Sequence, residues 1–117
     1  MRGEAGLQSS CIEWFGLQFP KLAPLLFAIP NGGWRNKKEA ANLKRQGVRA
    51  GVSDLILLFP KGGYSSLCIE MKYKKGHQRE SQKAWQTIAE AAGNKYVVCR
   101  TLEGFMKEVK DYLGVKR

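Results

Sequence analysis

The stretch that decides the fold spans residues 52–72 and has the sequence Val-Ser-Asp-Leu-Ile-Leu-Leu-Phe-Pro-Lys-Gly-Gly-Tyr-Ser-Ser-Leu-Cys-Ile-Glu-Met-Lys. Two apolar runs rich in β-prone residues flank residues 60–63, whose proline and paired glycines are typical of a turn. The stretch is therefore predicted to form an antiparallel hairpin.

The hairpin geometry predicts which polar side chains meet. Facing residues of an antiparallel pair have numbers with a constant sum, so a turn centred near Gly62 places Asp54 opposite roughly Glu70. Side chains alternate between the faces of a strand, which puts Lys72 on the same face as Glu70. Two carboxylates about 5 Å apart repel each other, but beside an ammonium they suit a divalent cation such as Mg²⁺ with an activated water. The alternative is a surface hairpin with a cross-strand Glu/Lys pair.

Length and composition indicate one globular domain. With 117 residues, 44% of them hydrophobic, the chain is long enough for a single core, and we expect one domain over residues 1–117. No apolar run approaches the roughly 20 residues that span a bilayer, and the N-terminus lacks the apolar core of a signal peptide. We therefore expect a cytoplasmic protein without a membrane partner.

The cysteines and the histidine restrict the available chemistry. Cys11, Cys68 and Cys99 are far apart in the sequence and lie among apolar neighbours, which predicts reduced core residues. With His77 as the single histidine and no paired cysteines, the sequence supports neither a Ser/His/Asp triad nor a zinc cluster. What remains is carboxylate and lysine chemistry.

The charge balance points to a polyanionic partner. Twenty basic and ten acidic residues give a formal net charge of +10, and nucleic acid is the commonest partner of such a surface. The basic residues gather in segments 35–49 and 73–79, for which we predict phosphate contact rather than a merely solvated face. Many small basic proteins bind nucleic acid without catalysing a reaction, so charge leaves both outcomes open.

The order of helices and strands predicts the α/β class. The segment 53–59 is apolar on both faces, as expected of a central strand covered on both sides. The whole order fits a mixed central β-sheet flanked by helices on both faces. Helices are predicted over residues 4–19, 36–46, 79–92 and 102–113, and strands over residues 25–29, 53–59 and 96–100. A further strand is predicted in the second arm of the hairpin, after the turn at residues 60–63 and up to Lys72.

Polar residues on two apolar helix faces are further candidates. Glu4 and Gln8 continue the apolar stripe of the first helix, so both are predicted to point inward; the alternative is a frayed terminal glutamate in water. Gln82 lies in the first turn of the buried face of the 79–92 helix and should face Glu70 and Lys72. Its alternative role is to satisfy nearby backbone groups.

Taken together, these motifs resemble the VRR-NUC family of the PD-(D/E)XK nuclease superfamily, and more closely its standalone, minimal phage and bacterial members. The resemblance covers nearly the whole chain. One position differs, because Ser53 stands where the family usually has a proline; that position shapes the backbone and supplies no ligand. The matching residues, in order, are Pro30-Asn31-Gly32-Gly33, Arg35, Gly47, Gly51-Val52-Ser53-Asp54, Glu70-Met71-Lys72, Lys75-Gly76 and Gln82.

The resemblance implies a restriction-endonuclease-like core and Mg²⁺-dependent hydrolysis of DNA phosphodiesters, with Mn²⁺ able to substitute. It implies that Asp54, Glu70 and the backbone carbonyl of Met71 bind the metal. Glu4 is the expected further ligand, because it matches a glutamate that families of this fold often add from the first helix, and Glu13 is the second choice.

The same resemblance assigns the remaining roles. Lys72 is expected to position or help deprotonate the attacking water and to stabilise the phosphorane, and Gln82 to support Lys72 and the water. The loop with Asn31 and Arg35 is expected to hold a phosphate, with an ordinary tight turn as the alternative. The side chains expected to contact DNA are Asn31, Arg35, Lys37, Lys38, Lys44, Arg45, Arg49, Lys74, Lys75 and Arg79.

The expected substrate follows from symmetry and from the resemblance. One small domain offers one site, so coordinated cutting of two strands needs two copies, and a C₂ homodimer matches the symmetry of a four-way junction. Minimal standalone relatives are associated with junction resolution, so we expect a homodimer that resolves Holliday junctions or related branched DNA in bacterial or phage-infected cells, with a role in DNA repair. The alternatives are a flap or nick nuclease of the same fold, a catalytically silent DNA-binding protein, and a protein-interaction role.

Overall fold

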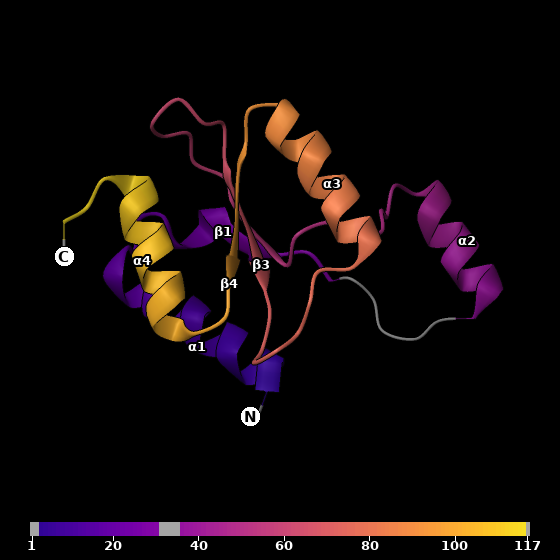
Figure 1. Cartoon of the computed structure of the whole chain (residues 1–117), viewed down its shortest axis with the longest axis horizontal. Helices are drawn as coiled ribbons and strands as arrows, with labels where there is room; N and C mark the ends of the chain where they lie inside the picture. The colour runs from indigo at the N-terminus through magenta and orange to yellow at the C-terminus, as the bar shows by residue number, and fades with distance from the viewer. Residues whose placement is uncertain (1–2, 31–35, 117) are drawn as a thin grey trace.

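The structure, a computed structural model, describes residues 3–30 and 36–116. No helix within these residues is long and apolar enough to cross a membrane. The order of elements is the predicted one, with a 3-10 helix added before the first strand (Figure 1). The elements are α1 (Gly3–Gln18), η1 (Ala23–Leu25), β1 (Leu26–Ala28), α2 (Lys37–Arg45), β2 (Leu55–Leu57), β3 (Leu67–Met71), α3 (Glu80–Ala91), β4 (Lys95–Cys99) and α4 (Leu102–Leu113).

The four strands form one mixed sheet in the order β1-β2-β3-β4. β1 and β2 are antiparallel, as are β2 and β3. β3 and β4 are parallel, and α3 provides the crossover that parallel neighbours require. The α/β class and the mixed sheet predicted from the sequence are confirmed.

The predicted hairpin forms around a tight turn. Leu55 pairs with Ile69 and Leu57 with Leu67. At the tip Lys61 bridges to Tyr64. Between them, Gly62 and Gly63 have φ angles of 59° and 87°. Such left-handed conformations at both central positions are typical of a two-residue hairpin turn. The strand register continues to the position where Asp54 faces Glu70.

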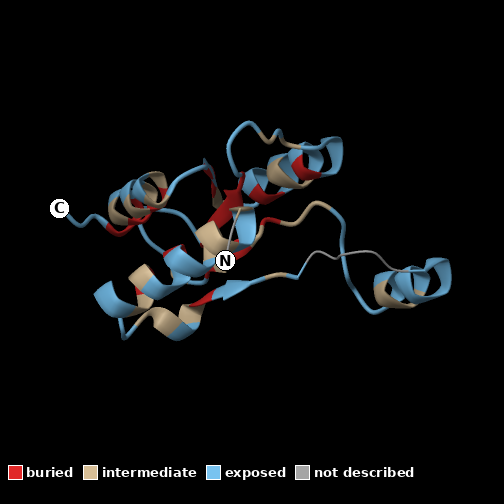
Figure 2. Ribbon diagram, turned by 90° about the horizontal axis from the view of Figure 1, so that it is seen from below, coloured by how far each residue is buried: buried red, intermediate tan, exposed pale blue. Residues whose placement is uncertain are grey.

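The main core lies on the face of the sheet that α1 and α4 cover, and Figure 2 shows the buried residues concentrated along the strands. Cys11 and Phe15 of α1 and Phe105 of α4 are fully buried against alternate strand residues. Trp14, which the sequence did not single out, adds edge-to-face contacts with Phe19 and Phe105. The cysteines Cys11, Cys68 and Cys99 are free and buried, as predicted.

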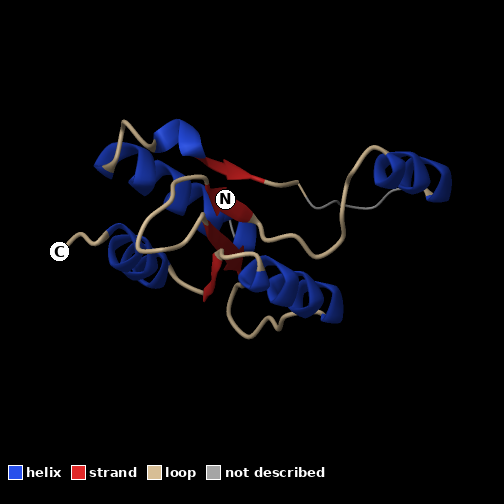
Figure 3. Cartoon of the chain, turned by 90° about the horizontal axis from the view of Figure 1, so that it is seen from above, coloured by secondary structure: helices blue, strands red, loops and turns tan. Residues whose placement is uncertain are grey.

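The prediction of a central strand covered on both faces is wrong for β2. Its outward face is partly open, since Leu58 is 56% exposed and Ile56 is half-buried. Phe27 on the adjacent strand is also 38% exposed. The reason is the position of α3, which covers this face of the sheet but packs against β4, away from β1 and β2 (Figure 3).

Helix α2 stands apart from the sheet and from the other helices (Figures 1 and 3). None of its nine residues, all of which are described, is buried. The helix is nevertheless well terminated: the Asn36 side chain accepts a 2.7 Å hydrogen bond from the Glu39 backbone N–H. Gly47, with φ 105°, follows its C-terminal end. α2 is therefore held by its own local interactions and by the chain on either side.

Candidate active site

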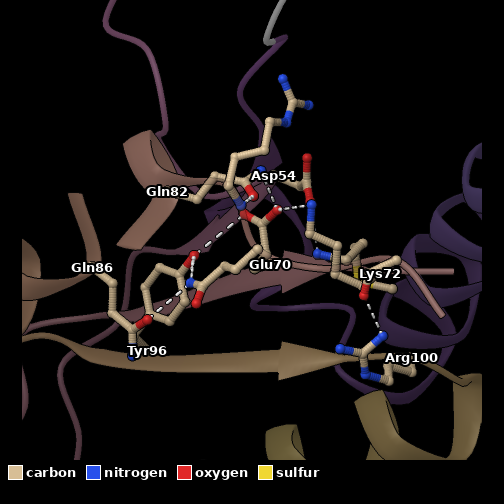
Figure 4. Close-up of polar contacts among 11 residues, drawn as sticks. Asp54, Glu70, Lys72, Gln82, Gln86, Tyr96 and Arg100 are labelled. Carbon is tan, nitrogen blue, oxygen red and sulfur yellow. Dashed lines mark hydrogen bonds and ion pairs between the residues drawn. The ribbon is translucent and has the colours of Figure 1, made fainter. Parts of the chain in front are cut away.

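The hairpin brings Asp54, Glu70 and Lys72 to the end of β3 (Figure 4). Asp54 immediately precedes β2 and is half-buried, whereas Glu70 is 1% and Lys72 is 7% exposed. The Lys72 Nζ atom lies 3.4 Å from Glu70 Oε2. The convergence predicted from register and alternation is confirmed. The alternative of a solvated surface pair is wrong, because Glu70 and Lys72 are buried.

Asp54 is fixed by the main chain of the opposite strand. Its Oδ2 atom accepts a 2.6 Å hydrogen bond from the backbone N–H of Met71. The N–H and C=O of one strand residue point toward the same neighbouring strand. The Met71 carbonyl, expected from the sequence to be a ligand, therefore faces the side of β3 on which Asp54 lies.

Gln82 connects the start of α3 to Glu70. Its Oε1 atom accepts a 2.7 Å hydrogen bond from the backbone N–H of Arg79, which fixes which end of the amide faces Glu70. Its Nε2 atom then donates to Glu70 Oε2 at 2.6 Å. One amide therefore satisfies a backbone group and also reaches Glu70, as both interpretations expected; a role in supporting Lys72 and the water stays a prediction.

Tyr96 of β4 reaches the same carboxylate, which the sequence did not predict. Its hydroxyl lies 3.3 Å from Glu70 Oε1, and Gln78 Nε2 lies 3.1 Å from the hydroxyl oxygen. Gln78 Nε2 also donates to Gln86 Oε1 at 2.8 Å (Figure 4). Alternation along β4 could have placed Tyr96 on the α3 side, but its neighbour on β3 depends on a parallel register that the sequence does not reveal.

The two carboxylates share an environment that disfavours negative charge. Burial, followed by the charge of Asp54, raises the pKa of Glu70 to about 7, against the opposing effect of Lys72. Burial also raises the pKa of Asp54, with a smaller contribution from the charge of Glu4, while the hydrogen bond from Met71 lowers it. A cation beside these groups would compensate this excess of buried negative charge.

The donor set suits a hard divalent ion. Asp54, Glu70 and the Met71 carbonyl offer only oxygen atoms, and Mg²⁺ is commonly held by one or two carboxylates while it keeps several waters. Within residues 3–30 and 36–116, no group of three or more His, Cys, Asp or Glu side chains is gathered at one point. Two carboxylates and a carbonyl are thus the candidate ligands that this part of the structure offers.

The prediction that Glu4 points inward is wrong, because Glu4 is exposed and Gln8 is only half-buried. The apolar stripe of α1 packs on the sheet, and its first turn extends past the strands (Figure 1). Glu4 is nevertheless close enough for its charge to raise the pKa of Asp54. Glu13, the second choice, is also exposed. A metal-binding role for either glutamate stays a prediction.

The basic loop after Lys72 borders the site. Lys74, Lys75 and Arg79 are exposed, and the charge of Arg79 lowers the pKa of Asp54, so this side chain is near the carboxylates. Arg100, which the sequence did not single out, donates from Nη1 to the carbonyls of Lys74 and Gly76 at 3.0 and 2.7 Å. The loop is therefore anchored to the residue that follows β4.

The other predicted DNA contacts fall into two groups. Asn31 and Arg35 lie outside the described residues. The basic side chains of α2 and the segment that follows it are exposed, on the element that stands apart from the sheet (Figure 1). These residues are Lys37, Lys38, Lys44, Arg45 and Arg49.

Comparison with known proteins agrees with this geometry. The model of the VRR-NUC domain matches residues 4–102. A solved structure named "VRR_NUC domain protein" is 26% identical, with a TM-score of 0.85, over 98% of this chain and 91% of that one. No curated protein sequence gives a significant match. The chain belongs to the VRR-NUC family and has its nuclease-type fold.

Proposed function

We propose that this protein is a Mg²⁺-dependent endonuclease that hydrolyses DNA phosphodiesters. The observation that carries the proposal is the buried Glu70 carboxylate, with Asp54 opposite it and the Lys72 ammonium 3.4 Å away. Burying like charges costs free energy, and carboxylates with a raised pKa in such surroundings are typical of functional sites. Membership of the VRR-NUC family supports the same chemistry.

In this mechanism Asp54, Glu70 and the Met71 carbonyl would hold the ion, which supplies positive charge to polarise the scissile phosphate and acidify a nearby water. Lys72 positions the attacking water and stabilises the charge that develops on the phosphorane. Its own position is set by the ion pair with Glu70. Gln82 donates to Glu70 and keeps that carboxylate in place.

The basic surface is proposed to hold the DNA backbone. Lys74, Lys75 and Arg79 follow Lys72 directly, so they can contact phosphates next to the cleaved one. The lysines and arginines of α2 extend the positive surface away from the site. Each neutralised phosphate releases counterions, so binding should weaken steeply with salt.

We further propose branched DNA, above all a four-way junction, as the substrate of a homodimer. The described residues form one such site per chain, and paired cuts in a junction require two sites related by two-fold symmetry. A flap or nick nuclease would use the same residues with one protomer at a time. The choice between them rests on where the DNA is cut.

The test uses labelled four-way junction, flap, nicked duplex and linear duplex with Mg²⁺, Mn²⁺ or EDTA. Asp54→Ala removes a proposed ligand, and Asp111→Ala is the matched control, since Asp111 pairs with Lys107 on α4 away from the site. Symmetric junction cuts that are lost with EDTA and in Asp54→Ala, but kept in Asp111→Ala, would support the whole proposal. Preferential cutting of flaps or nicks would replace the substrate and keep the chemistry. Binding without cleavage in either metal would leave a silent DNA-binding protein.

A further inference from the structure

The Glu70 carboxylate is held from two sides by different elements. Its Oε2 atom accepts a hydrogen bond from Gln82 Nε2 of α3 and lies 3.4 Å from the Lys72 ammonium. Its Oε1 atom has Tyr96 of β4 as its partner, at 3.3 Å. Each carboxylate oxygen has about two acceptor sites. Among the described residues, Oε2 therefore has partners at both sites, whereas Oε1 has a partner at one.

The direction of the hydrogen bond between Tyr96 and Glu70 follows from the groups behind it. Gln86 donates its Nε2 to the Glu90 carboxylate at 3.3 Å, so its Oε1 faces Gln78 and accepts from Gln78 Nε2 at 2.8 Å. The same Nε2 donates its second hydrogen to the Tyr96 oxygen at 3.1 Å. The Tyr96 hydrogen is then left for Glu70 Oε1, because an amide NH₂ can only donate.

The hydrogen bonds of this chain run outward from Gln78, through Gln86 to Glu90 on one side and through Tyr96 to Glu70 on the other. The Tyr96 ring is also fixed, because it is buried and packs against Trp85 of α3 with ring centroids 6.2 Å apart. A donor on a fixed ring restricts rotation of the carboxylate that accepts from it. With Gln82 holding the other oxygen, the carboxylate plane of Glu70 is set by two donors from different elements.

We propose that Tyr96 is a positioning residue that holds the Glu70 carboxylate in the orientation in which it binds the divalent ion. This inference rests on the proposed function, in which Glu70 is a ligand. Groups that orient a metal ligand raise affinity without touching the metal, and their loss typically weakens binding about tenfold or more. Gln78 contributes through Tyr96, since it supplies the donor that directs the tyrosine hydrogen toward Glu70.

The variant Tyr96→Phe removes the hydroxyl and keeps the ring. The matched control is Tyr112→Phe, because Tyr112 is also buried and donates to a carbonyl, that of Phe59 at 2.6 Å, remote from the site. Mn²⁺ binding is measured by titration calorimetry without DNA, and kcat and KM are measured on DNA at fixed metal. Gln78→Leu is the second variant should Tyr96→Phe fail to fold.

We expect Mn²⁺ to bind about tenfold more weakly to Tyr96→Phe, with kcat lowered and KM for DNA unchanged, and with Gln78→Leu affected in the same direction. Tyr112→Phe should bind Mn²⁺ as the unmodified protein does, whatever its melting temperature. Equal Mn²⁺ binding by Tyr96→Phe and the unmodified protein, or no Mn²⁺ binding by the unmodified protein, would overturn the inference. Mn²⁺ binding that depends on Tyr96 without any DNA cleavage would instead refute the proposed nuclease activity alone.

Discussion

The Oδ2 atom of Asp54 lies 2.6 Å from the backbone nitrogen of Met71, so a side chain from one arm of the hairpin bonds the main chain of the other. Asp54 thus has two separable properties: it accepts a structural hydrogen bond and it carries a charge next to Glu70. Asp54→Asn keeps an acceptor and removes the charge, whereas Asp54→Ala removes both.

We expect Asp54→Asn to lower the cleavage rate at least about 100-fold, because a proposed metal ligand loses its charge. Its melting temperature should equal or exceed that of the unmodified protein, since repulsion with Glu70 disappears. Asp54→Ala should cost about 1–3 kcal/mol of stability, because the Met71 N–H loses its partner. Gel assays and thermal unfolding measure both effects. A fully active Asp54→Asn variant would refute the role given to Asp54.

The free energy of unfolding without metal should fall as pH rises from 5 to 8. Burial and the charge of Asp54 raise the pKa of Glu70 from 4.5 to about 7, so between these values the folded state holds a proton that the unfolded state has lost. This contribution to the free energy of unfolding is fully present below pH 4.5 and is lost as the pH rises through 7. It amounts to at most about 3 kcal/mol. Urea unfolding in EDTA, compared with Glu70→Gln, isolates this contribution. Equal pH dependence in the two proteins would contradict it.

Gly51 should tolerate alanine far less well than another glycine of similar conformation. Both Gly51 (φ 83°) and Gly63 (φ 87°) are left-handed, which costs alanine about 1–2 kcal/mol. A Cβ atom at Gly51 would also lie 2.2 Å from the Ser81 carbonyl oxygen, whereas one at Gly63 meets nothing within 4 Å. Gly51→Ala should therefore melt at a lower temperature than Gly63→Ala. It should also bind Mn²⁺ more weakly, because the start of α3 that carries Gln82 must move.

Arg100 should matter for the order of the basic loop. Its Nη1 atom donates to the carbonyls of both Lys74 and Gly76, and the lysine ammonium, at the end of a shorter side chain, does not reach the same point. Arg100→Lys keeps the net charge. Weaker DNA binding and faster trypsin cleavage at Lys74 and Lys75 would therefore reflect a less ordered loop and not a change in charge. The conservative change Arg45→Lys on α2 is the control. Unchanged cleavage of the loop in Arg100→Lys would show that other contacts hold it.

The basic residues of α2 should contribute to DNA binding and not to stability. Because no α2 residue is buried, the double variant Lys44→Gln/Arg45→Gln should unfold at the same temperature as the unmodified protein. If both side chains contact phosphates, the slope of log binding constant against log salt should decrease by about 2. The double variant Lys107→Gln/Lys116→Gln removes the same charge at the other end of the chain. Equal slopes in the two variants would mean that only net charge matters.

The hairpin shows how far a sequence can determine a site. Three residues, 58–60, separate Leu57 from Lys61, but only residues 65 and 66 separate Tyr64 from Leu67. A register extended strictly from the tip would turn Glu70 to the wrong face. Centring the turn on Gly62 gave the correct pairing, although no sequence feature marks the additional residue.

The contacts that β4 makes with β3 and its neighbours could not be predicted from the sequence. β4 reaches β3 only through α3, and the length of a crossover does not fix the register of the parallel pair. Tyr96 and Arg100 were missed for this reason. Gln82 was predicted because helical periodicity alone placed it at the buried start of α3. Glu4 was placed wrongly because the same periodicity does not reveal where the sheet beneath a helix ends.

The path of the chain around α2 has a consequence for how this fold can vary. Ile29 donates its backbone N–H to the Asp54 carbonyl at 2.9 Å, so the chain leaves the sheet after Ile29 and returns beside it. Antiparallel neighbours can be joined by a turn of a few residues. The arm that carries α2 is therefore, in topological terms, an insertion within a hairpin. One contiguous segment can be shortened, lengthened or exchanged between relatives while Asp54, Glu70 and Lys72 keep their places.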